Sequence, residues 1–332
     1  MSQWTKRAAL FAALLIVATP AVAQQINEIR IDQPSTDNDE YFELFGTPNQ
    51  ALDGLTYVVI GDGSTASGTI EEAIDLTGLA LDANGYFVAA EGSFTLGVAD
   101  FTTSLNFENS DNVTHMLVTG FTGANGQDLD TNDDCVLDVT PWASIVDSIA
   151  LVEEANPPTG TECFYGTGIG PESNQGGTFI PGQIYRCGNR WFMGLFDPAS
   201  GTDTPGAANA DLNMNLLGTP STGNSVSFQI CAQGQDGNTA QVLLSCSGTA
   251  GIVLPGSGGL TLPLTFDACT ALSLNLAVAL RGTVGATDSG VADTPSLPVP
   301  ATGGPVSAWA AAFTTSGASF VSVTSAIDFT IN

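Results

Sequence analysis

The sequence contains very few basic residues. Only six Lys and Arg and a single His stand against 34 Asp and Glu, and the formal net charge is −28. Because nucleic-acid binding requires cations that neutralise phosphates, this balance excludes nucleic acid as an expected partner. It also excludes adhesion to an anionic membrane surface without a metal ion. A single His cannot build a zinc site of the usual kind, which takes two or three His ligands.

Long hydrophobic runs are missing as well. The apolar run at residues 8–18 is shorter than the ~18 residues that a membrane span requires, so no membrane span is expected. This run follows Lys6 and Arg7 and precedes an A-x-A motif that ends at Ala23. The order is typical of a secretory signal peptide over residues 1–23, cleaved after its last residue. We therefore expect a protein that is secreted or held at the cell surface.

Cleavage would leave four Arg, no Lys and a net charge of −30. The lack of Lys excludes Schiff-base chemistry, a P-loop lysine and a Ser-Lys nucleophile. No C-x-x-C motif occurs, which argues against zinc and redox sites of that type. His115 lies in an apolar run without a G-x-S-x-G motif, so we expect an ordinary core or strand histidine rather than a catalytic base.

The sequence does have enough apolar residues for a packed core, distributed over two unequal halves. Hydrophobic residues make up 43% of the chain. Residues 24–208 hold 28 of the acids, whereas residues 209–332 hold six. The change falls at residues 203–209, a loop rich in Gly, Pro and Asn. We place a domain boundary there.

Both halves contain short apolar or alternating runs between clusters of Gly, Asp and Asn, the pattern of antiparallel strands. The expected strands are Thr56–Ile60, Tyr86–Ala90, His115–Thr119, Ser144–Val152, Ser225–Ile230, Ala240–Cys246, Leu260–Phe266, Ala271–Leu280, Val306–Phe313, Phe320–Val323 and Ile327–Ile331. Turns are expected at Gly61–Ser64 and, within a hairpin, at Gln235–Asn238. Only Glu71–Leu76 is expected to form a helical turn. The sequence thus predicts an all-β protein with two antiparallel β-sandwich domains.

Three motifs in the first half carry a family resemblance. They are Ile26-Asn27-Glu28-Ile29, Asp39-Glu40-Tyr41-Phe42-Glu43-Leu44 and Leu52-Asp53-Gly54-Leu55-Thr56-Tyr57. Together they resemble the opening strands of the lamin-tail domain, in the type found in secreted bacterial proteins. The resemblance implies an immunoglobulin-like sandwich over residues 24–208 with an acidic loop extension, and a role as an interaction module. Glu28, Glu40 and Glu43 either face solvent or cap turns, or form a metal or recognition face.

The second half carries a different resemblance. Leu217–Ser225 and Ile327–Asn332 resemble a Gly/Pro-rich β-sandwich at the C-terminus of secreted proteins from planctomycetes and similar bacteria. This resemblance implies no activity. Asn112-Val113-Thr114 matches an N-glycosylation acceptor motif.

An acidic loop in the first half has metal-ligand spacing. With Asp130 as position 1, the loop follows the D-x-[DN]-x-[DN] rule of calcium loops. The expected calcium ligands are Asp128, Asp130, Asn132, Asp134, the carbonyl of Val136 and Asp138. Cys135 and Pro141 stand where Gly and Glu are usual, and a distant acid such as Asp147 could complete the shell. The alternative is a solvated acidic loop.

A second group of acids is a further candidate for metal binding. Its members are Asp32, Asp37, Asp39 and Glu40. The six cysteines of a secreted chain predict disulfides. The expected pairs are Cys163–Cys187 and Cys231–Cys246. Cys135 and Cys269 remain, and an interdomain bond between them is possible.

Two functions of different classes fit these features. The first is a secreted, non-catalytic interaction or adhesion module that binds a surface polymer or protein and contains a calcium-stiffened loop. The second is a carboxylate- or calcium-dependent hydrolase of polysaccharide or phosphoester. Its sugar-stacking candidates are Trp142, Trp191, Tyr165 and Tyr185, unless these are buried sandwich aromatics. The lack of a catalytic constellation favours the first.

Overall fold

The computed structural model describes residues 24–62, 67–154, 162–171, 179–209, 212–276 and 278–332. The expected signal peptide and residues 63 and 64 of the expected turn lie outside these ranges. The described chain is almost entirely antiparallel β-structure, which confirms the all-β prediction. No helix in the described ranges is long and apolar enough to cross a membrane.

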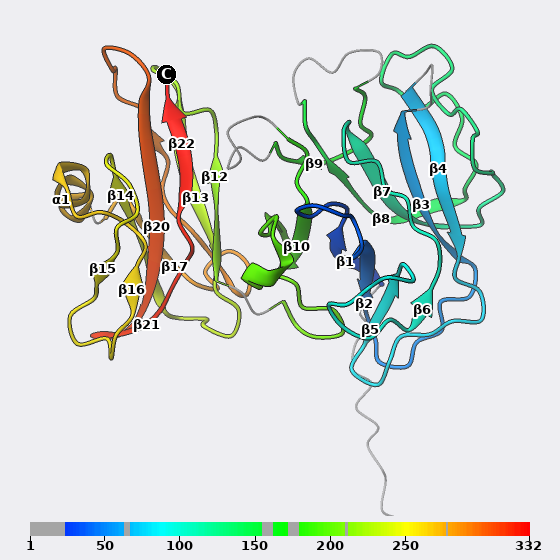
Figure 1. Ribbon diagram of the computed structural model, residues 1–332, viewed down its shortest axis with the longest axis horizontal. Coiled ribbons are helices and arrows are strands. Elements are labelled where there is room, and N and C mark those ends of the chain that lie inside the picture. Colours follow the sequence, from blue (N-terminus) through cyan, green and yellow to red (C-terminus); the bar gives the residue numbers. More distant parts are fainter. Residues whose placement is uncertain (1–23, 63–66, 155–161, 172–178, 210–211, 277) are drawn as a thin grey trace, which may run out of the picture.

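Two sheets build the first sandwich (Figure 1). The first sheet has the order β11-β10-β1-β2-β5-β6 and the second has the order β4-β3-β7-β8-β9. Their strands are β1 (Gln25–Arg30), β2 (Tyr41–Phe45), β3 (Leu55–Asp62), β4 (Ser67–Asp75), β5 (Tyr86–Ala90), β6 (Phe101–Thr102), β7 (Val113–Thr119), β8 (Ser144–Leu151), β9 (Gly168–Ile169), β10 (Gln183–Cys187) and β11 (Arg190–Met193). All neighbours pair antiparallel except β5–β6 and β8–β9.

Apolar side chains from both sheets form one core in this sandwich. Phe42 of β2 stacks on Tyr57 of β3 with ring centroids 3.7 Å apart. The Tyr57 hydroxyl lies 2.9 Å from Nδ1 of His115, which is fully buried on β7. Burial lowers the pKa of His115 to about 3, so the ring is neutral. The prediction of a core histidine is confirmed.

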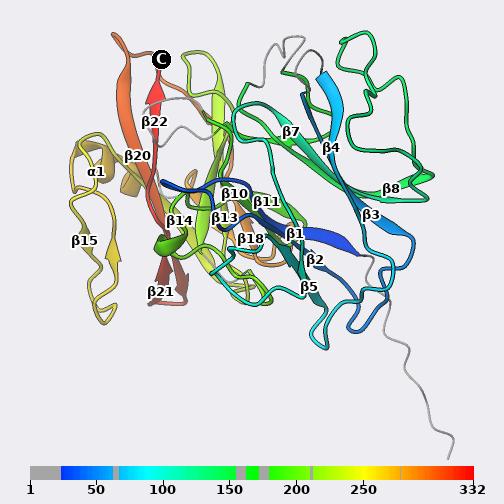
Figure 2. The same ribbon diagram turned by 45° about the vertical axis from the view of Figure 1, so that its right-hand side comes forward.

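The second sandwich is made from strands after residue 212 (Figure 2). One sheet has the order β12-β13-β18, with β19 also on β13, and the other has the order β17-β14-β20-β21, with β22 also on β20. The elements are β12 (Asn213–Leu217), β13 (Ser225–Cys231), β14 (Thr239–Ser245), β15 (Ile252–Val253), β16 (Thr261–Leu262), α1 (Ala268–Asn275), β17 (Arg281–Thr283), β18 (Val291–Asp293), β19 (Leu297–Pro298), β20 (Val306–Ser316), β21 (Ser319–Val323) and β22 (Ile327–Ile331). A short β15–β16 pair and α1 flank this sandwich.

Three local predictions were wrong, and the expected turn at Gly61–Ser64 cannot begin at Gly61, because Gly61 and Asp62 belong to β3. Glu71–Leu76 is not helical, because it lies mostly in β4, which pairs with β3. Ala271–Leu280 is not a strand, because Asp267 caps a helix there. Its carboxylate accepts the N–H of Thr270, whose hydroxyl accepts the Asp267 N–H in return. Gln235–Asn238 does not close a hairpin, since β13 and β14 belong to different sheets.

The disulfide predictions were also wrong. The bonds are Cys135–Cys163, Cys187–Cys231 and Cys246–Cys269. Spacing along the chain was a poor guide, because β10 of the first sandwich lies beside β13 of the second. An interdomain disulfide exists, but it is Cys187–Cys231. Three disulfides are typical of a protein that folds in an oxidising compartment.

The two sandwiches are joined through more than this disulfide. Tyr185 and Phe192 pack with Val291 and the disulfide in one buried cluster. The side-chain amides of Asn213 and Asn215 donate to carbonyl groups of β11, at 2.6 and 2.9 Å. These amides satisfy part of an otherwise unpaired strand edge. A disulfide, a buried apolar cluster and side-chain hydrogen bonds therefore all join the two sandwiches.

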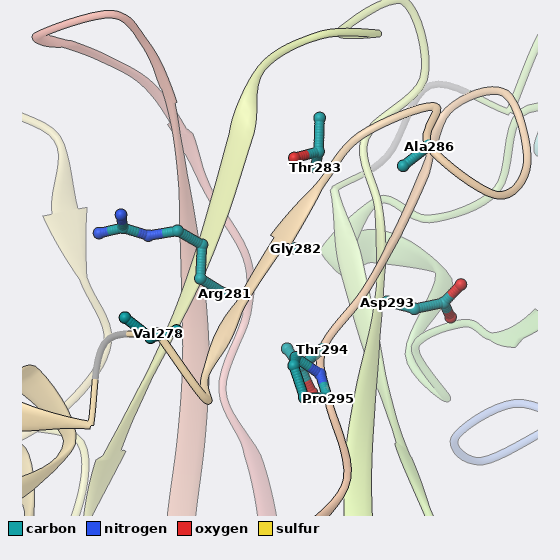
Figure 3. Close-up of a pocket in the computed structure, with 8 residues that line it drawn as sticks. All are labelled: Val278, Arg281, Gly282, Thr283, Ala286, Asp293, Thr294 and Pro295. Carbon is teal, nitrogen blue, oxygen red and sulfur yellow. The ribbon is translucent and has the colours of Figure 1, made fainter.

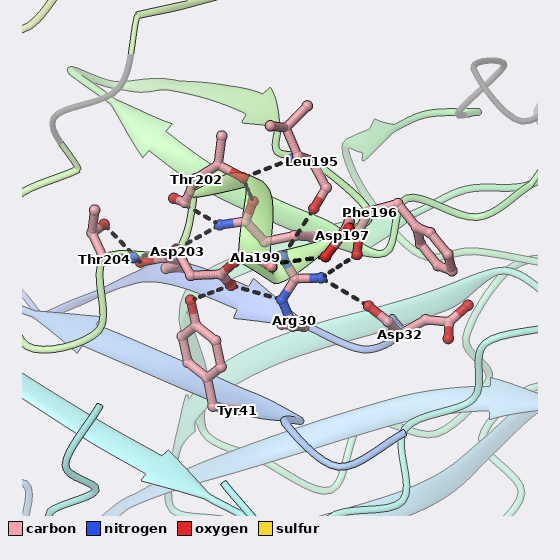
Figure 4. A network of polar contacts seen from close by, with 12 residues as sticks. Arg30, Asp32, Tyr41, Leu195, Phe196, Asp197, Ala199, Thr202, Asp203 and Thr204 are labelled. Atoms are coloured by element: carbon pink, nitrogen blue, oxygen red, sulfur yellow. Dashed lines mark hydrogen bonds and ion pairs between the residues drawn. The ribbon is translucent and has the colours of Figure 1, made fainter. Parts of the chain in front are cut away.

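The segment between the sandwiches is anchored in the first one by buried polar groups (Figure 4). The guanidinium of Arg30 binds both carboxylate oxygens of Asp203, at 2.7 and 2.6 Å. A short 3-10 helix at Pro198–Ser200 precedes this segment. Glu28 accepts the N–H of Thr204 and Glu43 accepts the N–H of Gly206.

These contacts show how Glu28, Glu40 and Glu43 are accommodated in the fold. All three side chains are buried, so the expectation that they face solvent was wrong. Their carboxylates accept hydrogen bonds from backbone groups of distant segments. Acids on strands are tolerated there because each has specific donors.

Candidate metal centre

A β-bulge redirects Glu71 on the edge strand β4. Val59 pairs with Glu72, whereas its neighbour Ile60 pairs with Ile70, so Glu71 is an extra residue between two rungs of the ladder. Bulges of this kind change the direction in which a side chain points. Glu71 thereby leaves the regular alternation of the strand.

Three carboxylates meet beside this bulge. Asp62 ends β3, Glu71 comes from β4, and Glu108 comes from the loop before β7. Oxygen atoms of all three lie within 4.8 Å of one another. Gly61 provides the space, because a Cβ atom on it would lie only 2.6 Å from the carboxyl carbon of Glu71. We call these three residues the carboxylate triad.

Three more acids extend this group through Asp111, and a buried asparagine holds the backbone of two of them. They are Asp111, Glu153 and Glu162. The Asn112 side chain accepts the N–H groups of Glu153 and Glu154 and donates to the carbonyls of Glu154 and Glu162. We call the triad and these three acids the acidic pole. The side chain of Asn112 is buried and fully used in hydrogen bonds, so the folded protein does not offer it for glycosylation.

The pKa values of the acidic pole reflect burial and mutual repulsion. Burial, with the charges of Glu108 and Asp62, raises the pKa of Glu71 to about 8. Burial, with the charges of Asp111 and Glu108, raises the pKa of Asp62 to about 6. A hydrogen bond with Asp111, together with burial, raises the pKa of Glu162 to about 7. One oxygen of Glu71 and one of Glu162 are buried without a hydrogen-bond partner among the described residues.

No basic side chain of the described chain neutralises this pole. Arg30, Arg186 and Arg190 form ion pairs with Asp203, Asp147 and Asp288. Arg281, in the second sandwich, donates to Gln241 at 3.2 Å. The negative charge of the acidic pole is therefore balanced by protons or by a cation from solution.

The predicted calcium loop lies between β7 and β8. Asp130 is fully buried, and its carboxylate accepts from the N–H groups of Asp134 and Cys135 and from the Tyr165 hydroxyl. Cys135 has a φ of 65°, the left-handed conformation that Gly usually supplies at this position. The loop is further closed by the disulfide to Cys163.

The other predicted ligands also make hydrogen bonds inside this loop. Asp128 accepts from Asp130, Asn132 from Asp134, Asp134 from Val136, and Asp138 from Thr131. Within the described ranges, no three acids of this loop bring oxygens within 4.8 Å of one another, as the triad does. Asp147 is on β8, bound to Arg186. Calcium binding by Asp128–Asp138 stays a prediction.

The remaining candidates are the second acidic group and the aromatic residues. Burial and the charges of Asp37 and Glu91 raise the pKa of Glu40 to about 8, so part of the second acidic group does lie together, and metal binding there stays a prediction. In the second acidic group, Asp39 accepts from Thr95 and Glu40 accepts from Phe107. Among the possible sugar-stacking residues, Tyr165 and Tyr185 are buried. Trp191 packs against the guanidinium of Arg186 at 4.3 Å. Trp142 is half-buried against the core beneath the acidic loop.

An open hollow of about 430 Å³ lies on the second sandwich between β17 and β18 (Figure 3). Arg281 and Asp293 line it, but their charged groups point to opposite sides. The hollow lacks the convergent polar groups of a binding pocket.

No protein-family model matches this sequence, and no curated protein is significantly similar to it. The lamin-tail resemblance and its immunoglobulin-like topology therefore stay predictions from the three sequence motifs. The geometry of the acidic pole carries the functional conclusion instead.

Proposed function

We propose that this protein is an extracellular, non-catalytic interaction module whose acidic pole binds a divalent cation, with calcium as the best fit. The carboxylate triad is the observation that carries the proposal. Its three carboxylates come from three segments, are partly desolvated and have no basic partner in the described chain. Such a group is costly as separate anions and favourable around one cation.

The donor set supports calcium over softer metals. Every candidate ligand is a carboxylate oxygen, and calcium accepts six to eight oxygens in flexible geometry. Asp62, Glu71 and Glu108 would hold the ion, and the unpartnered oxygen of Glu71 would gain a ligand. The ion would supply positive charge at a surface that otherwise repels anionic partners. A surface polymer or protein with oxygen donors is the partner class that this chemistry favours.

The hydrolase alternative has less support. Two of the four aromatic residues proposed for sugar stacking are fully packed in the interior. We therefore keep hydrolysis as an outcome of the test rather than as a second proposal.

Calcium titration calorimetry tests the proposal, with matched substitutions on one strand. We expect Glu71→Gln to weaken calcium binding at least tenfold, about 1.4 kcal/mol, because it removes a triad carboxylate. Glu72→Gln, the adjacent residue outside the triad, should bind like the original protein. Affinity should also rise from pH 6 to pH 8, because the pKa of Glu71 is about 8 and the ion must displace its proton.

Several outcomes would overturn the proposal. An absence of both binding heat and a calcium-dependent rise in melting temperature would contradict it, since a ligand of the folded state must stabilise that state. Loss of binding in Asp130→Asn but not in Glu71→Gln would place the ion in the loop Asp128–Asp138 instead. Turnover of a polysaccharide or phosphoester that Glu71→Gln abolishes would make the protein a hydrolase.

A further inference from the structure

A buried threonine and a buried glutamine lie in contact where the segment between the sandwiches begins (Figure 4). The Thr202 hydroxyl donates to the carboxamide oxygen of Gln183 at 2.6 Å, and the two residues are 7% and 0% exposed. Because a C=O bond is about 1.2 Å long, the carboxamide carbon lies at most about 3.8 Å from the hydroxyl oxygen. Reacting atoms in near-attack arrangements are about 3–3.5 Å apart. A nucleophile and an acyl group are therefore neighbours in the interior.

Backbone contacts fix both groups in this position. The N–H of Leu195 donates to the Thr202 hydroxyl at 2.7 Å, and the carbonyl of Thr202 accepts from the Gln183 carboxamide at 3.2 Å. Gly194 provides the space, because a Cβ atom on it would overlap the carboxamide oxygen. Arg30 holds the same segment through the carbonyl of Leu195. Two side chains fixed in this way have already lost most of the freedom that a reaction between them would cost.

A carboxyl group completes the arrangement. Glu28 is fully buried, and one of its oxygens accepts from the amide nitrogen of Gln183 at 2.5 Å. Burial raises the pKa of Glu28 to about 7, so its protonated and ionised forms are both populated at neutral pH. A carboxyl group with such a pKa can donate a proton to a leaving nitrogen and then accept one. Glu28 thus contacts the atom that would leave.

We propose that Thr202 and Gln183 form an ester bond in the folded protein. The Thr202 oxygen attacks the carboxamide carbon, the carbon–nitrogen bond of the carboxamide breaks, and ammonia leaves. Glu28 protonates the leaving nitrogen and is restored to its acid by the proton released from the hydroxyl, so the reaction needs no oxidant, cofactor or other reactant. The ester cross-links β10 to the segment that leads into the second sandwich. This modification goes beyond cation binding and does not depend on it.

The second sandwich contains a matched pair that lacks the carboxyl group. The Thr314 hydroxyl donates to the carboxamide oxygen of Gln235 at 2.6 Å, as in the first pair. In the described chain, the hydrogen bonds of this carboxamide are to hydroxyl and amide groups, with Ser322 accepting from its nitrogen at 3.0 Å. We expect this pair to stay unreacted, because no acid is in place to protonate the leaving nitrogen.

Peptide mapping of the full chain after reduction of its disulfides tests the cross-link. Trypsin cleaves after arginine, which places Gln183 in residues 31–186 and Thr202 in residues 191–281. None of the three disulfides joins these two peptides, and we expect to recover them joined from most molecules, with the mass of one ammonia less than their sum. Hydroxylamine, which cleaves esters, should separate them. The joined pair is the readout because an N-terminal glutamine can also lose ammonia.

Substitutions identify the atoms that react. Thr202→Val removes the nucleophile and should abolish the joined pair, whereas Thr202→Ser keeps a hydroxyl and should retain it. Glu28→Gln keeps the size of the side chain and should lower the joined fraction at least about tenfold in freshly purified protein, because one acid–base group contributes about 10²–10⁴-fold in rate. Far-UV circular dichroism shows that each variant is folded.

Three results would contradict the proposal. Recovery of residues 31–186 and 191–281 only as separate peptides from the original protein overturns it. A joined pair that persists in Thr202→Val overturns it as well, since another residue would then carry the bond. Residues 191–281 joined to residues 282–332 through Gln235 and Thr314 would show that the hydrogen bond alone is sufficient and that Glu28 has no catalytic role.

Discussion

Replacing Arg30 by Met is expected to lower the free energy of unfolding by about 3–5 kcal/mol. The Arg30 side chain is 0% exposed, and Asp203, its partner at 2.6 Å, is 4% exposed. The guanidinium also donates to three backbone carbonyls, those of Asp32, Leu195 and Phe196. Methionine fills similar volume but leaves a buried carboxylate and three carbonyls without their donor. Urea unfolding at pH 7 measures the loss.

A matched control is available in the same protein. Arg190 pairs with Asp288 at 3.7 Å and is 44% exposed. Arg190→Met should therefore cost less than about 1 kcal/mol, as exposed ion pairs usually do. Replacing Asp203 by Leu together with Arg30→Met should recover part of the loss, because no unpaired charge stays buried. Similar losses in Arg30→Met and Arg190→Met would mean that burial is not what makes the first pair important.

Local patterns in the sequence predicted most of the fold. Tyr86–Ala90 is a short apolar run and Ser144–Val152 is a longer, mostly apolar one, and they form β5 and β8 with at most one residue of difference. The same signal failed at Ala271–Leu280, where the alternation is that of a strand. There the capping hydrogen bonds of Asp267 and Thr270 stabilise a helix instead. The sequence signal for the start of this helix was Asp267 followed three residues later by Thr270.

Disulfide partners and buried acids were harder to predict, because they depend on contacts between distant segments. Cys187 meets Cys231 only because β10 and β13 lie side by side. The motifs around Glu28 and Glu43 left open whether these acids face solvent. Their donors at Thr204 and Gly206 lie more than 160 residues along the chain, where no local pattern points to them.

The candidate metal centre also has a part that local sequence predicted and a part that depends on contacts between distant segments. The loop around Asp130 was found by spacing because its oxygens are close in sequence. The triad joins Asp62, Glu71 and Glu108 from three segments, and a bulge that the alternation does not predict turns Glu71 toward the other two. Consecutive acids at Glu71 and Glu72 on an edge strand were the only sequence signal. The acids that meet Glu71 could be identified only once the pairing register of β3 and β4 was known.

The stability of the protein should fall as pH rises from about 5 to about 9, by at least about 3 kcal/mol. Burial and the charge of Glu28 raise the pKa of Glu43 to about 9. Burial, together with the charge of Asp203, raises the pKa of Glu28 to about 7, against hydrogen bonds from Tyr41 and Thr204 that lower it. Because these pKa values are higher in the folded protein, the folded state binds more protons. The stability that these two carboxyl groups contribute is fully present below pH 4.5, their pKa in the unfolded chain. It is lost as the pH rises through about 7 and about 9, the pKa values of Glu28 and Glu43 in the folded protein.

Chemical unfolding across this pH range, in EDTA, measures the slope of the unfolding free energy against pH. Glu43→Gln should flatten it, because the amide does not titrate. Asp328→Asn removes one charge at an exposed position of β22 and should leave the slope unchanged. A stability that rises with pH, or a slope that Glu43→Gln does not alter, would contradict the prediction.

In this experiment, calcium distinguishes Glu71 from Glu28 and Glu43, all three of which have raised pKa values. Without the ion, Glu71 adds to the slope in the same direction, because its pKa is about 8. A bound cation would favour the ionised form of Glu71 and remove that part of the slope. Glu28 and Glu43 have their hydrogen-bond partners in other segments, among them Gln183, Thr204 and Gly206, so their part should persist in calcium. A slope that calcium reduces only in proteins that retain Glu71 would assign the two contributions to two different sites of the first sandwich.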